Sequence, residues 1–397
     1  MKQLSKTQAI LVRIVANWPA HLPLCLFAGD ERYSLVPLTF KKTGYSEAQK
    51  MPIRCNFSAQ RQFPFTKGIL GLLNYSDLNE SLIYHVERVL TINHRTQEIR
   101  IHGNGTDDPD YFQIYDEDIE AIISEDGSRD LVAPFQLIPK STEQDYLQQA
   151  EKVIEEIKRG RFYQLNLLRY FEVLNSQFRP SCLEKFFKQS ARMSVWLESM
   201  DQTVISFSPE RFIKITPNKN YSVIDTFPIK GTVPVTEEPE NLLNSFKDQA
   251  ELAMIIDLMR NDLTQICEPG SVKVADKGVL VSNPYVHHLQ GHVTGKLKTP
   301  LTFGELLSSV FPAGSITGAP KKEVMQAIQE YEKRPRNFFM GSAFYLDEDG
   351  YFDSSVLIRT LCKRGETAEY AAGSGLVVKS IPEKELAEIS AKCAVLN

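Results

Sequence analysis

The chain has 397 residues and a formal net charge of −5, with 42% hydrophobic and 24% charged residues. This length suits one large domain or two closely packed ones, and the composition is that of an ordinary globular protein. The mild acidic charge argues against a nucleic-acid-binding protein, which would carry a basic surface.

Signals for metals, disulfides and membranes are weak along the whole sequence. The six cysteines have no repeated spacing, which indicates free thiols in a reducing compartment. His288 and His292 lie close together without a third ligand nearby, so a zinc site is disfavoured. Arg13 interrupts the apolar stretch ILVRIVANW, and no run reaches the ~18 apolar residues of a membrane helix. We therefore expect a cytoplasmic protein without a membrane partner.

The first third of the chain contains short alternating apolar stretches and turn signals, but no concentrated set of reactive groups. The acidic loop at Asp107, Asp108 and Asp110 lacks the ligand periodicity of a calcium site and is better explained as a solvated loop. Two prolines in APFQLIPKST precede a helix signal. We place a boundary there, between an N-terminal subdomain, 1–135, and a catalytic domain, 136–397, within one fold.

Beyond this boundary the secondary-structure signals become stronger. Ser141 and Gln144 have the spacing of a capping box, and an apolar stripe over 146–157 predicts a helix after them. We expect further strands over 203–215, 221–226, 271–281, 285–297, 338–347 and 352–364, and helices over 237–265, after Pro320 and after Pro382. This irregular alternation of strands and helices favours the α+β class.

The segment FYQLNLLRYFEV alternates as a strand in which Gln164 and Asn166 share one face. Two amides on one face are explained either by polarity at a sheet edge or by a position in the wall of a pocket. The residues alone leave both explanations open.

Two charged residues have roles that depend on burial. Glu210, in SFSPERF, either pairs with Arg211 or a neighbouring lysine, or serves as a general acid if burial raises its pKa. Lys230 lies between Pro228 and Gly231 in DTFPIKGTVP. It is either a solvated residue in a turn or an amine held toward a pocket as a nucleophile.

Three carboxylates on two predicted helices form a candidate metal site. Glu251 shares a helical stripe with apolar residues, and Glu385, Glu388 and Lys392 stand on one face of the last helix. The simple explanation is a set of exposed acids with a surface Glu–Lys pair. The functional explanation is a Mg²⁺ ion, which takes few protein carboxylates and completes its shell with water and substrate oxygens.

Three segments are candidates for binding anions. GSITGAPKK places the hydroxyls of Ser315 and Thr317 before a helix start, without the Gly-Lys-Ser/Thr of a P-loop. GSG at 373–375 precedes a predicted strand and offers consecutive backbone N–H groups, although a simple turn explains it equally. Arg359 lies inside the predicted apolar strand SSVLIRTL and there needs a counter-anion.

Taken in chain order, nine motifs of this sequence resemble those of chorismate-utilising enzymes. They are FYQLNL, SPERF, PIKGT, MIIDLMRNDL, CEPGSVKV, HHLQGHVTG, GSITGAPKKEVM, IRTL and AGSGLV, followed by the acidic last helix. The resemblance covers residues from about 140 to 397 and points to the aminodeoxychorismate synthase branch, with anthranilate and isochorismate synthases as relatives. It implies two large packed antiparallel β-sheets flanked by helices, in two intertwined subdomains.

The resemblance also implies a reaction, which is amination of chorismate at C4 to 4-amino-4-deoxychorismate on the route to 4-aminobenzoate and folate. The amine of Lys230 would attack C2 of chorismate, and ammonia would then add at C4 and release the lysine. Sequences that resemble anthranilate synthase carry alanine at the position of Lys230. Relatives that add water at C2 carry a lysine base at the position of Gln164. For this attack Lys230 must be neutral, so we expect its pKa to be lowered.

Further roles come from the same resemblance. Glu210 would protonate the departing hydroxyl. Glu251 and Glu388 would hold Mg²⁺, with Glu385 in support through water. The residues expected to bind chorismate are Gln164, Thr232, His288, Ser315, Thr317, Arg359, Gly373, Ser374, Gly375 and Lys392.

Four positions depart from the resembling pattern. Phe227 stands where an arginine is common, Gly291 replaces a serine, Met340 an aromatic residue and Ala313 a glycine. These departures affect the edge of the expected pocket. The N-terminal part has no clear LLES-like segment, so we predict no tryptophan site.

No cysteine lies in a Gly-x-Cys-x-Gly turn, so we expect a separate glutamine amidotransferase subunit to supply ammonia. Two other functions remain as alternatives. Component I of anthranilate synthase is disfavoured by Lys230. A non-catalytic chorismate-binding subunit is disfavoured because Glu210, Lys230, Glu251 and Glu388 are all present.

Overall fold

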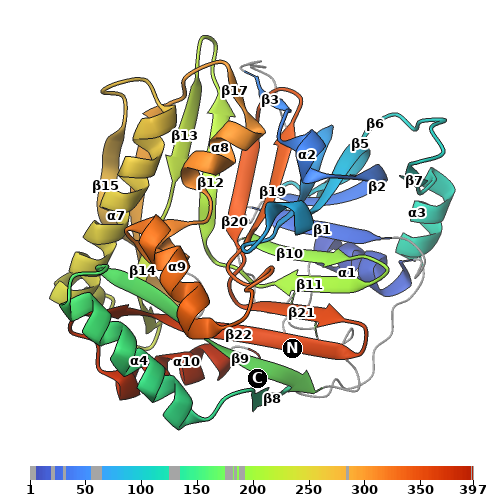
Figure 1. The fold of residues 1–397 in the computed structure, drawn as a ribbon. Coiled ribbons are helices and arrows are strands. Elements are labelled where there is room, and N and C mark those ends of the chain that lie inside the picture. Colours follow the sequence, from blue (N-terminus) through green and yellow to red (C-terminus); the bar gives the residue numbers. More distant parts are fainter. Residues whose placement is uncertain are drawn as a thin grey trace.

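The computed structural model describes residues 6–18, 23–29, 33–54, 65–124, 135–174, 182, 186, 193–282, 286–394 and 396. Within this part of the chain, antiparallel pairing connects 20 strands into one hydrogen-bonded network. A single registered pair, Phe27 with Leu35, joins two halves of this network, which we name sheet I and sheet II. Strands β12, β13 and β20 of sheet II run across the direction of β21 and β22 of sheet I (Figure 1).

Sheet I contains, in order of pairing, β8 (Gln136–Pro139), β9 (Gln164–Leu174), β22 (Thr367–Val377), β21 (Thr360–Arg364), β11 (Gln202–Ser206), β10 (Met193–Glu198) and β1 (Leu24–Gly29). Sheet II contains, in order of pairing, β2 (Tyr33–Thr43), β5 (Leu82–Asn93), β4 (Gly68–Leu73), β19 (Ser342–Asp347), β20 (Phe352–Val356), β12 (Arg211–Pro217), β13 (Ser222–Thr226), β16 (Val286–Lys296) and β15 (Lys273–Ser282).

Shorter strands extend these sheets. They are β6 (Glu98–Gly103) on β5, β7 (Phe112–Gln113) on β2, β14 (Ile229–Pro234) on β16 and β18 (Gly318–Ala319) on β9. Strands β3 (Pro52–Ile53) and β17 (Leu301–Thr302) pair with each other. The helices are α1 (Lys6–Asn17), α2 (Tyr45–Ala48), α3 (Asp116–Ser124), α4 (Glu143–Lys158), α6 (Glu240–Asn244), α7 (Phe246–Ile266), α8 (Phe303–Val310), α9 (Lys321–Glu332) and α10 (Pro382–Ala394), with short 3₁₀ turns η1 (Leu78–Glu80) and η2 (Gly314–Ile316).

The two sheets pack through side chains that alternate along each strand. Val195 and Leu197 of β10 lie in a core shared with Leu35 and Phe40 of β2. Between them Trp196 points to the other face of sheet I, into the core that α1, α4, α9 and α10 cover. Since successive side chains of a strand face opposite sides, one apolar strand serves two cores. The predicted α+β fold with two large packed antiparallel sheets is confirmed.

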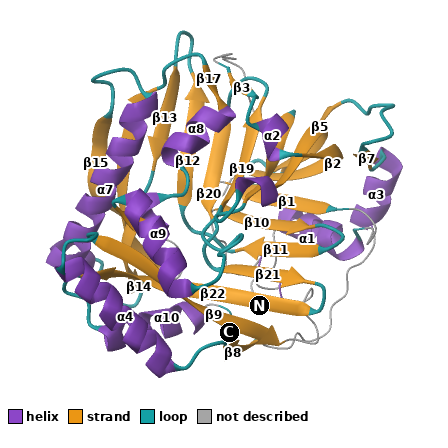
Figure 2. Cartoon of the chain, in the orientation of Figure 1, coloured by secondary structure: helices purple, strands orange, loops and turns teal. Residues whose placement is uncertain are grey.

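Helices α7 and α8 cover sheet II, and α4, α9 and α10 cover sheet I (Figures 1 and 2). The proposed boundary falls between Phe135 and Gln136, the first residue of β8, and residues 125–134 just before it lie outside the described part of the chain. Strands on its two sides share both sheets, because β1 pairs with β10 and β4 pairs with β19. In the described residues, no helix is both long and apolar enough to cross a membrane.

Several predicted elements are shifted or divided in the structure. The capping box before α4 lies one residue later, where Thr142 Oγ1 accepts from the Asp145 amide at 3.1 Å and the Thr142 amide donates to that carboxylate at 2.9 Å. The predicted helix over 237–265 is two helices, because Ser245 ends α6 and caps α7. The predicted strand over 203–215 is also two strands, β11 and β12.

Candidate active site

Lys230 lies in strand β14, where its backbone pairs with Leu289 of β16. The register is irregular between Lys230 and Thr232, and Gly231 between them has a φ of +71°. A Cβ at Gly231 would lie 2.9 Å from the Leu242 side chain and 3.1 Å from that of Asp248. The glycine of PIKGT is therefore required both by its φ and by the close approach of α6 and α7.

Charges from three other elements surround the Lys230 amine. Burial is the largest influence and lowers the pKa of Lys230. The carboxylate of Glu251 opposes this effect, the ammonium of Lys392 adds to it, and Glu210 and Glu388 oppose it more weakly. The predicted lowering of this pKa is thus present in the structure. Lys230 does not lie in a turn, as the alternative held, but in strand β14 with its side chain half-buried.

Glu210 lies between β11 and β12 and is only 6% exposed. Burial raises its pKa to about 7, although a hydrogen bond from Ser315 and the charges of Lys230 and Lys392 oppose the rise. Ser315 Oγ donates to Glu210 Oε1 at 2.7 Å. The alternative of a pair with Arg211 is wrong, because that guanidinium forms two hydrogen bonds with the Asp353 carboxylate, at 2.9 and 3.0 Å.

The three candidate metal ligands come from α7 and α10. Burial raises the pKa of Glu251, whose buried Oε1 has no hydrogen-bond partner in the described part of the chain. Glu385 accepts a hydrogen bond from Ser380 Oγ at 2.8 Å. Lys247 Nζ lies 3.8 Å from Glu251 Oε1 and 3.9 Å from Glu385 Oε1, so two of these acids meet at one ammonium.

Glu388 is the most exposed of the three, with 48% of its side chain accessible. Burial by itself would raise its pKa, but Lys392, whose Nζ lies 2.7 Å away, and the charges of Lys230 and Lys247 lower it. Among the residues that the structure describes, no three His, Cys, Asp or Glu side chains form a ready-made metal cluster. The acids instead lie next to ammonium groups.

The predicted GSG turn is part of strand β22, not a turn before a strand. A Cβ at Gly373 would lie 2.5 Å from Leu167 O, and one at Gly375 would lie 2.8 Å from Gln164 Nε2. Both glycines therefore permit close packing of β22 on β9. Lys392 Nζ donates to Gly373 O at 2.7 Å, and Ser374 Oγ shares a 2.9 Å hydrogen bond with the Tyr146 hydroxyl.

Gln164 and His288 are fully or almost fully buried. Gln164 has no exposed surface, and both atoms of its side-chain amide have no hydrogen-bond partner within the described residues. Two unsatisfied amide atoms are costly in a core, so polarity at a sheet edge does not explain them. His288 is 4% exposed and lies on β16 opposite the backbone of Thr232. The side chain of Thr232 is outside the described part of the structure.

Arg359 was predicted to lie inside a strand, but it lies in the turn between β20 and β21 with a φ of +53°. Burial lowers the pKa of Arg359, and in the described chain no carboxylate opposes that effect. Its cation is therefore available to an anion. Thr317, by contrast, is internally bonded, since its hydroxyl donates to Ala313 O at 2.9 Å.

Three charged residues near this site were not predicted from the sequence, namely Lys247 and the buried pair of Glu332 and Arg336. Lys247 stands four residues before Glu251 on α7, and this i,i+4 spacing was the available signal. Of the departures, Phe227 stacks on His292 with ring centroids 4.6 Å apart. Gly291 leaves room for Ile256, whose Cδ1 would lie 2.7 Å from a Cβ there.

A family model described as chorismate binding enzyme matches residues 42–397. Aminodeoxychorismate synthase component 1 of Klebsiella aerogenes is 32% identical over 84% of this chain and 78% of its own length. The protein of that name from Salmonella typhimurium is 39% identical over 58% of this chain, and the match spans 51% of that relative, about half of its length.

Solved structures share the fold at low identity. Anthranilate synthase component I from Streptococcus pneumoniae superposes with a TM-score of 0.76 at 23% identity, over 92% of each chain. MenF, the menaquinone-specific isochorismate synthase of Escherichia coli, superposes with a TM-score of 0.74 at 16% identity, over 100% of this chain and 91% of that one. Because the family model covers most of the sequence, the chain belongs to the chorismate binding enzyme family.

Proposed function

We propose that the chain aminates chorismate at C4 and forms 4-amino-4-deoxychorismate. The observation that carries this proposal is the pairing of a lysine whose pKa is lowered, Lys230, with a carboxyl whose pKa is raised to about 7, Glu210. The lowered pKa favours the neutral form of the amine that the attack requires, and the raised pKa keeps part of the Glu210 carboxyl protonated near neutral pH. Relatives named aminodeoxychorismate synthase component 1 support this reaction.

In the first step, the Lys230 nitrogen forms a bond to C2 of chorismate. The two ring double bonds shift, and the bond between C4 and its hydroxyl oxygen breaks. Glu210 gives its proton to that oxygen, which leaves as water, and the lysine nitrogen keeps the positive charge.

In the second step, ammonia bonds to C4, the double bonds shift back, and Lys230 leaves C2 as a neutral amine. The Glu210 carboxylate takes a proton from the new ammonium group, so both residues return to their starting states.

We further propose a Mg²⁺ site held by Glu251 and Glu388 and supported by Glu385. The donor chemistry fits, because hard carboxylates in small number suit this ion and a buried oxygen of Glu251 has no hydrogen-bond partner in the described chain. When bound, the ion would supply positive charge next to a substrate carboxylate. The dicarboxylate would also contact Arg359 and Lys392, and the ring would lie near Gln164, Thr232, His288, Ser315 and the Gly373–Gly375 strand.

We propose a separate glutamine amidotransferase as the source of ammonia. The word "component" in the names of the relatives supports a partner of this kind. No cysteine of the chain has the flanking glycines of a Gly-x-Cys-x-Gly nucleophile turn.

The test is product identity. The chain is incubated with chorismate, Mg²⁺ and an ammonium salt at mildly alkaline pH, and the product is identified by mass and fluorescence. We expect 4-amino-4-deoxychorismate. Formation of anthranilate or isochorismate in its place would contradict the proposal, and so would an absence of any product.

A further inference from the structure

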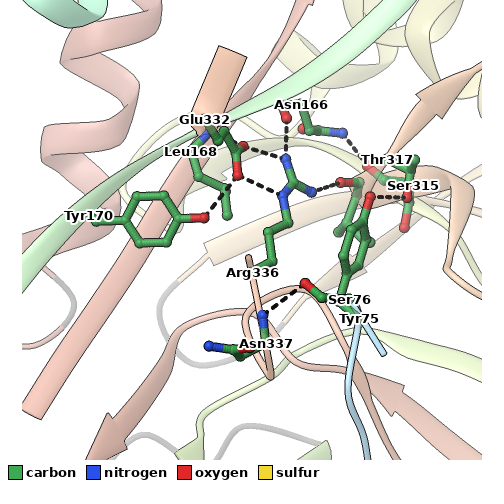
Figure 3. Close-up of polar contacts among 11 residues, drawn as sticks. Tyr75, Ser76, Asn166, Leu168, Tyr170, Ser315, Thr317, Glu332, Arg336 and Asn337 are labelled. Atoms are coloured by element: carbon green, nitrogen blue, oxygen red, sulfur yellow. Dashed lines mark hydrogen bonds and ion pairs between the residues drawn. The ribbon is translucent and has the colours of Figure 1, made fainter. Parts of the chain in front are cut away.

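A buried ion pair lies at the end of α9, away from the residues proposed to react. Glu332 and Arg336 each have 1% of their side chain exposed, and their closest approach is 2.6 Å (Figure 3). The Glu332 carboxylate also accepts from the Tyr170 hydroxyl at 2.8 Å and from the Leu168 amide at 3.1 Å. Desolvation offsets most of the attraction in such a pair, so stability alone explains its presence poorly.

The remaining donors of Arg336 bind the backbone at two points. Nη1 donates to Ile316 O at 3.1 Å, and Nη2 donates to Asn166 O at 2.6 Å. Ile316 belongs to the segment 313–320 between α8 and α9, and Asn166 belongs to β9. The planar guanidinium, neutralised by Glu332, therefore ties that segment to the strand that carries Gln164.

Asn166 fixes the same segment from the other side. Its Nδ2 donates to Ser315 O at 3.0 Å, and its amide donates to Thr317 O at 3.0 Å. Three consecutive carbonyls, those of Ser315, Ile316 and Thr317, are thus held by β9 and Arg336 (Figure 3). The Ser315 hydroxyl on this fixed backbone donates to Glu210.

We infer that Arg336 is a positioning residue that holds the segment 313–320 so that the Ser315 hydroxyl meets the Glu210 carboxyl. The catalytic meaning of this contact rests on the proposed role of Glu210 as the acid. Arg336 itself reaches Glu210 indirectly, through the backbone of Ile316 and Asn166 and then through Ser315.

The charges around both groups support an indirect route. Apart from burial, the pKa of Glu210 is shifted by Ser315, Lys230 and Lys392, and Arg336 does not contribute to that shift. The pKa of Arg336 is shifted by burial, by the Glu332 carboxylate and by the hydroxyls of Tyr75 and Tyr170. Because the Ser315 hydrogen bond holds the pKa of Glu210 down, release of the segment raises that pKa.

The experiment follows the ionisation of Glu210 without substrate. The infrared signal of its protonated carboxyl, identified as the difference from Glu210→Gln, is titrated in the full chain. We expect Arg336→Gln and Ser315→Ala each to raise the titration midpoint by about one pH unit, the size of one hydrogen bond to a charged group. The double variant should match Ser315→Ala alone, because both changes remove the same contact.

Arg334→Gln is the matched control. This arginine lies two residues away, carries the same charge, and pairs with Glu369 at 2.9 Å with 31% of its side chain exposed. It should leave the Glu210 midpoint unchanged. An unchanged midpoint in Arg336→Gln or in Ser315→Ala overturns the inference, and so does a double variant shifted beyond Ser315→Ala.

If Arg336→Gln fails to fold, Arg336→Lys replaces it. Lysine keeps the charge beside Glu332 but has no planar fork to bind two carbonyls, so a smaller shift in the same direction is expected and no shift overturns the inference. The alkaline limb of the amination rate should move with the midpoint. A shifted midpoint in a chain that makes no aminated product would contradict the proposed function and leave the positioning role standing.

Discussion

Two half-buried lysines of this chain, Lys321 and Lys230, have opposite surroundings. Lys321, at the start of α9, contacts Asp262 Oδ2 at 2.6 Å and donates to Val310 O at 3.0 Å. Lys230 has acids nearby, but in the described chain no ion pair joins it to one of them. Burial lowers the pKa of both lysines. The difference lies in the partner, since Lys321 Nζ contacts a carboxylate and a carbonyl, whereas no ion pair joins Lys230 to an acid in the described chain.

This contrast separates two uses of a buried charge. At Lys321 a direct pair holds α7, α8 and α9 together behind the segment 313–320. At Lys230 the nearby acids act on the amine through their charge alone. They limit how far its pKa falls but form no ion pair with it in the described chain. Substitutions at the two lysines should therefore affect different measurements.

The largest expected effect is the loss of chemistry in Lys230→Ala. Removal of the nucleophile should lower the rate of amination by roughly a thousandfold or more, because variants that lack a covalent nucleophile lose most of their rate. Product formation under single-turnover conditions measures this, and the melting temperature should not fall. Lys277→Ala, on the exposed face of β15, is the control and should keep the full rate. A Lys230→Ala variant that aminates normally would refute the covalent route.

At Lys321 the same kind of change should affect stability instead. Lys321→Met leaves the Asp262 carboxylate, which is 7% exposed in its side chain, without a partner. We expect a loss of about 3–5 kcal/mol in the free energy of unfolding, measured by urea denaturation.

The matched variant is the double change Asp262→Leu with Lys321→Met, which should recover most of that stability because no charge remains buried. If the double variant were as unstable as Lys321→Met, the pair would owe its effect to packing and not to charge.

Some features of the site were predicted from the sequence and others were not. The resemblance of PIKGT and the other motifs to chorismate-utilising enzymes placed Lys230 near Glu210, Glu251 and Glu388, whose charges act on its amine in the structure. It did not reveal that Arg359 sits in a turn, or that β22 continues through Gly373–Gly375. Those outcomes depend on pairing with β9 and β11, both of which lie more than 150 residues earlier in the chain.

The predicted ends of some helices were also wrong, because contacts between residues distant in the sequence decide them. Thr142 and Ser141 are both acceptable caps, and the choice is made by distant contacts, since Ser141 O accepts from the Arg169 guanidinium at 3.0 Å. Ser245 interrupts a stretch with continuous helical periodicity by capping α7 with its side chain. Such choices between neighbouring residues require the tertiary structure.

Glu210 extends the comparison to an acid whose charge is also disfavoured by burial. Its pKa rises from 4.5 to about 7 on folding, so between these values the folded state binds more protons than the unfolded state. Stability therefore falls as pH rises through this window, by about 3 kcal/mol in total. Glu210→Gln should lack this loss, so it should be more stable than the parent at pH 8 and similar to it at pH 4.

Denaturant unfolding at both pH values measures the difference, with Glu383→Gln on the exposed face of α10 as the control. An equal stability gain at both pH values would mean that the carboxyl is not held neutral in the folded chain.

The smallest effect concerns a third lysine, Lys247, which is 62% exposed and lies within 4 Å of both Glu251 and Glu385. Unlike Lys230 it would compete with the proposed Mg²⁺ for these carboxylates, and exposed pairs of this kind are worth up to about 1 kcal/mol. Lys247→Gln should therefore tighten Mg²⁺ binding by roughly fivefold, seen as a lower half-saturation point for the rise in melting temperature with added Mg²⁺. The control Lys277→Gln removes the same charge from an exposed site on β15 and should leave that point unchanged. Equal Mg²⁺ dependence in both variants would place the ion away from Glu251 and Glu385. If these acids held the ion, removing the positive charge of Lys247 next to them would change the Mg²⁺ affinity.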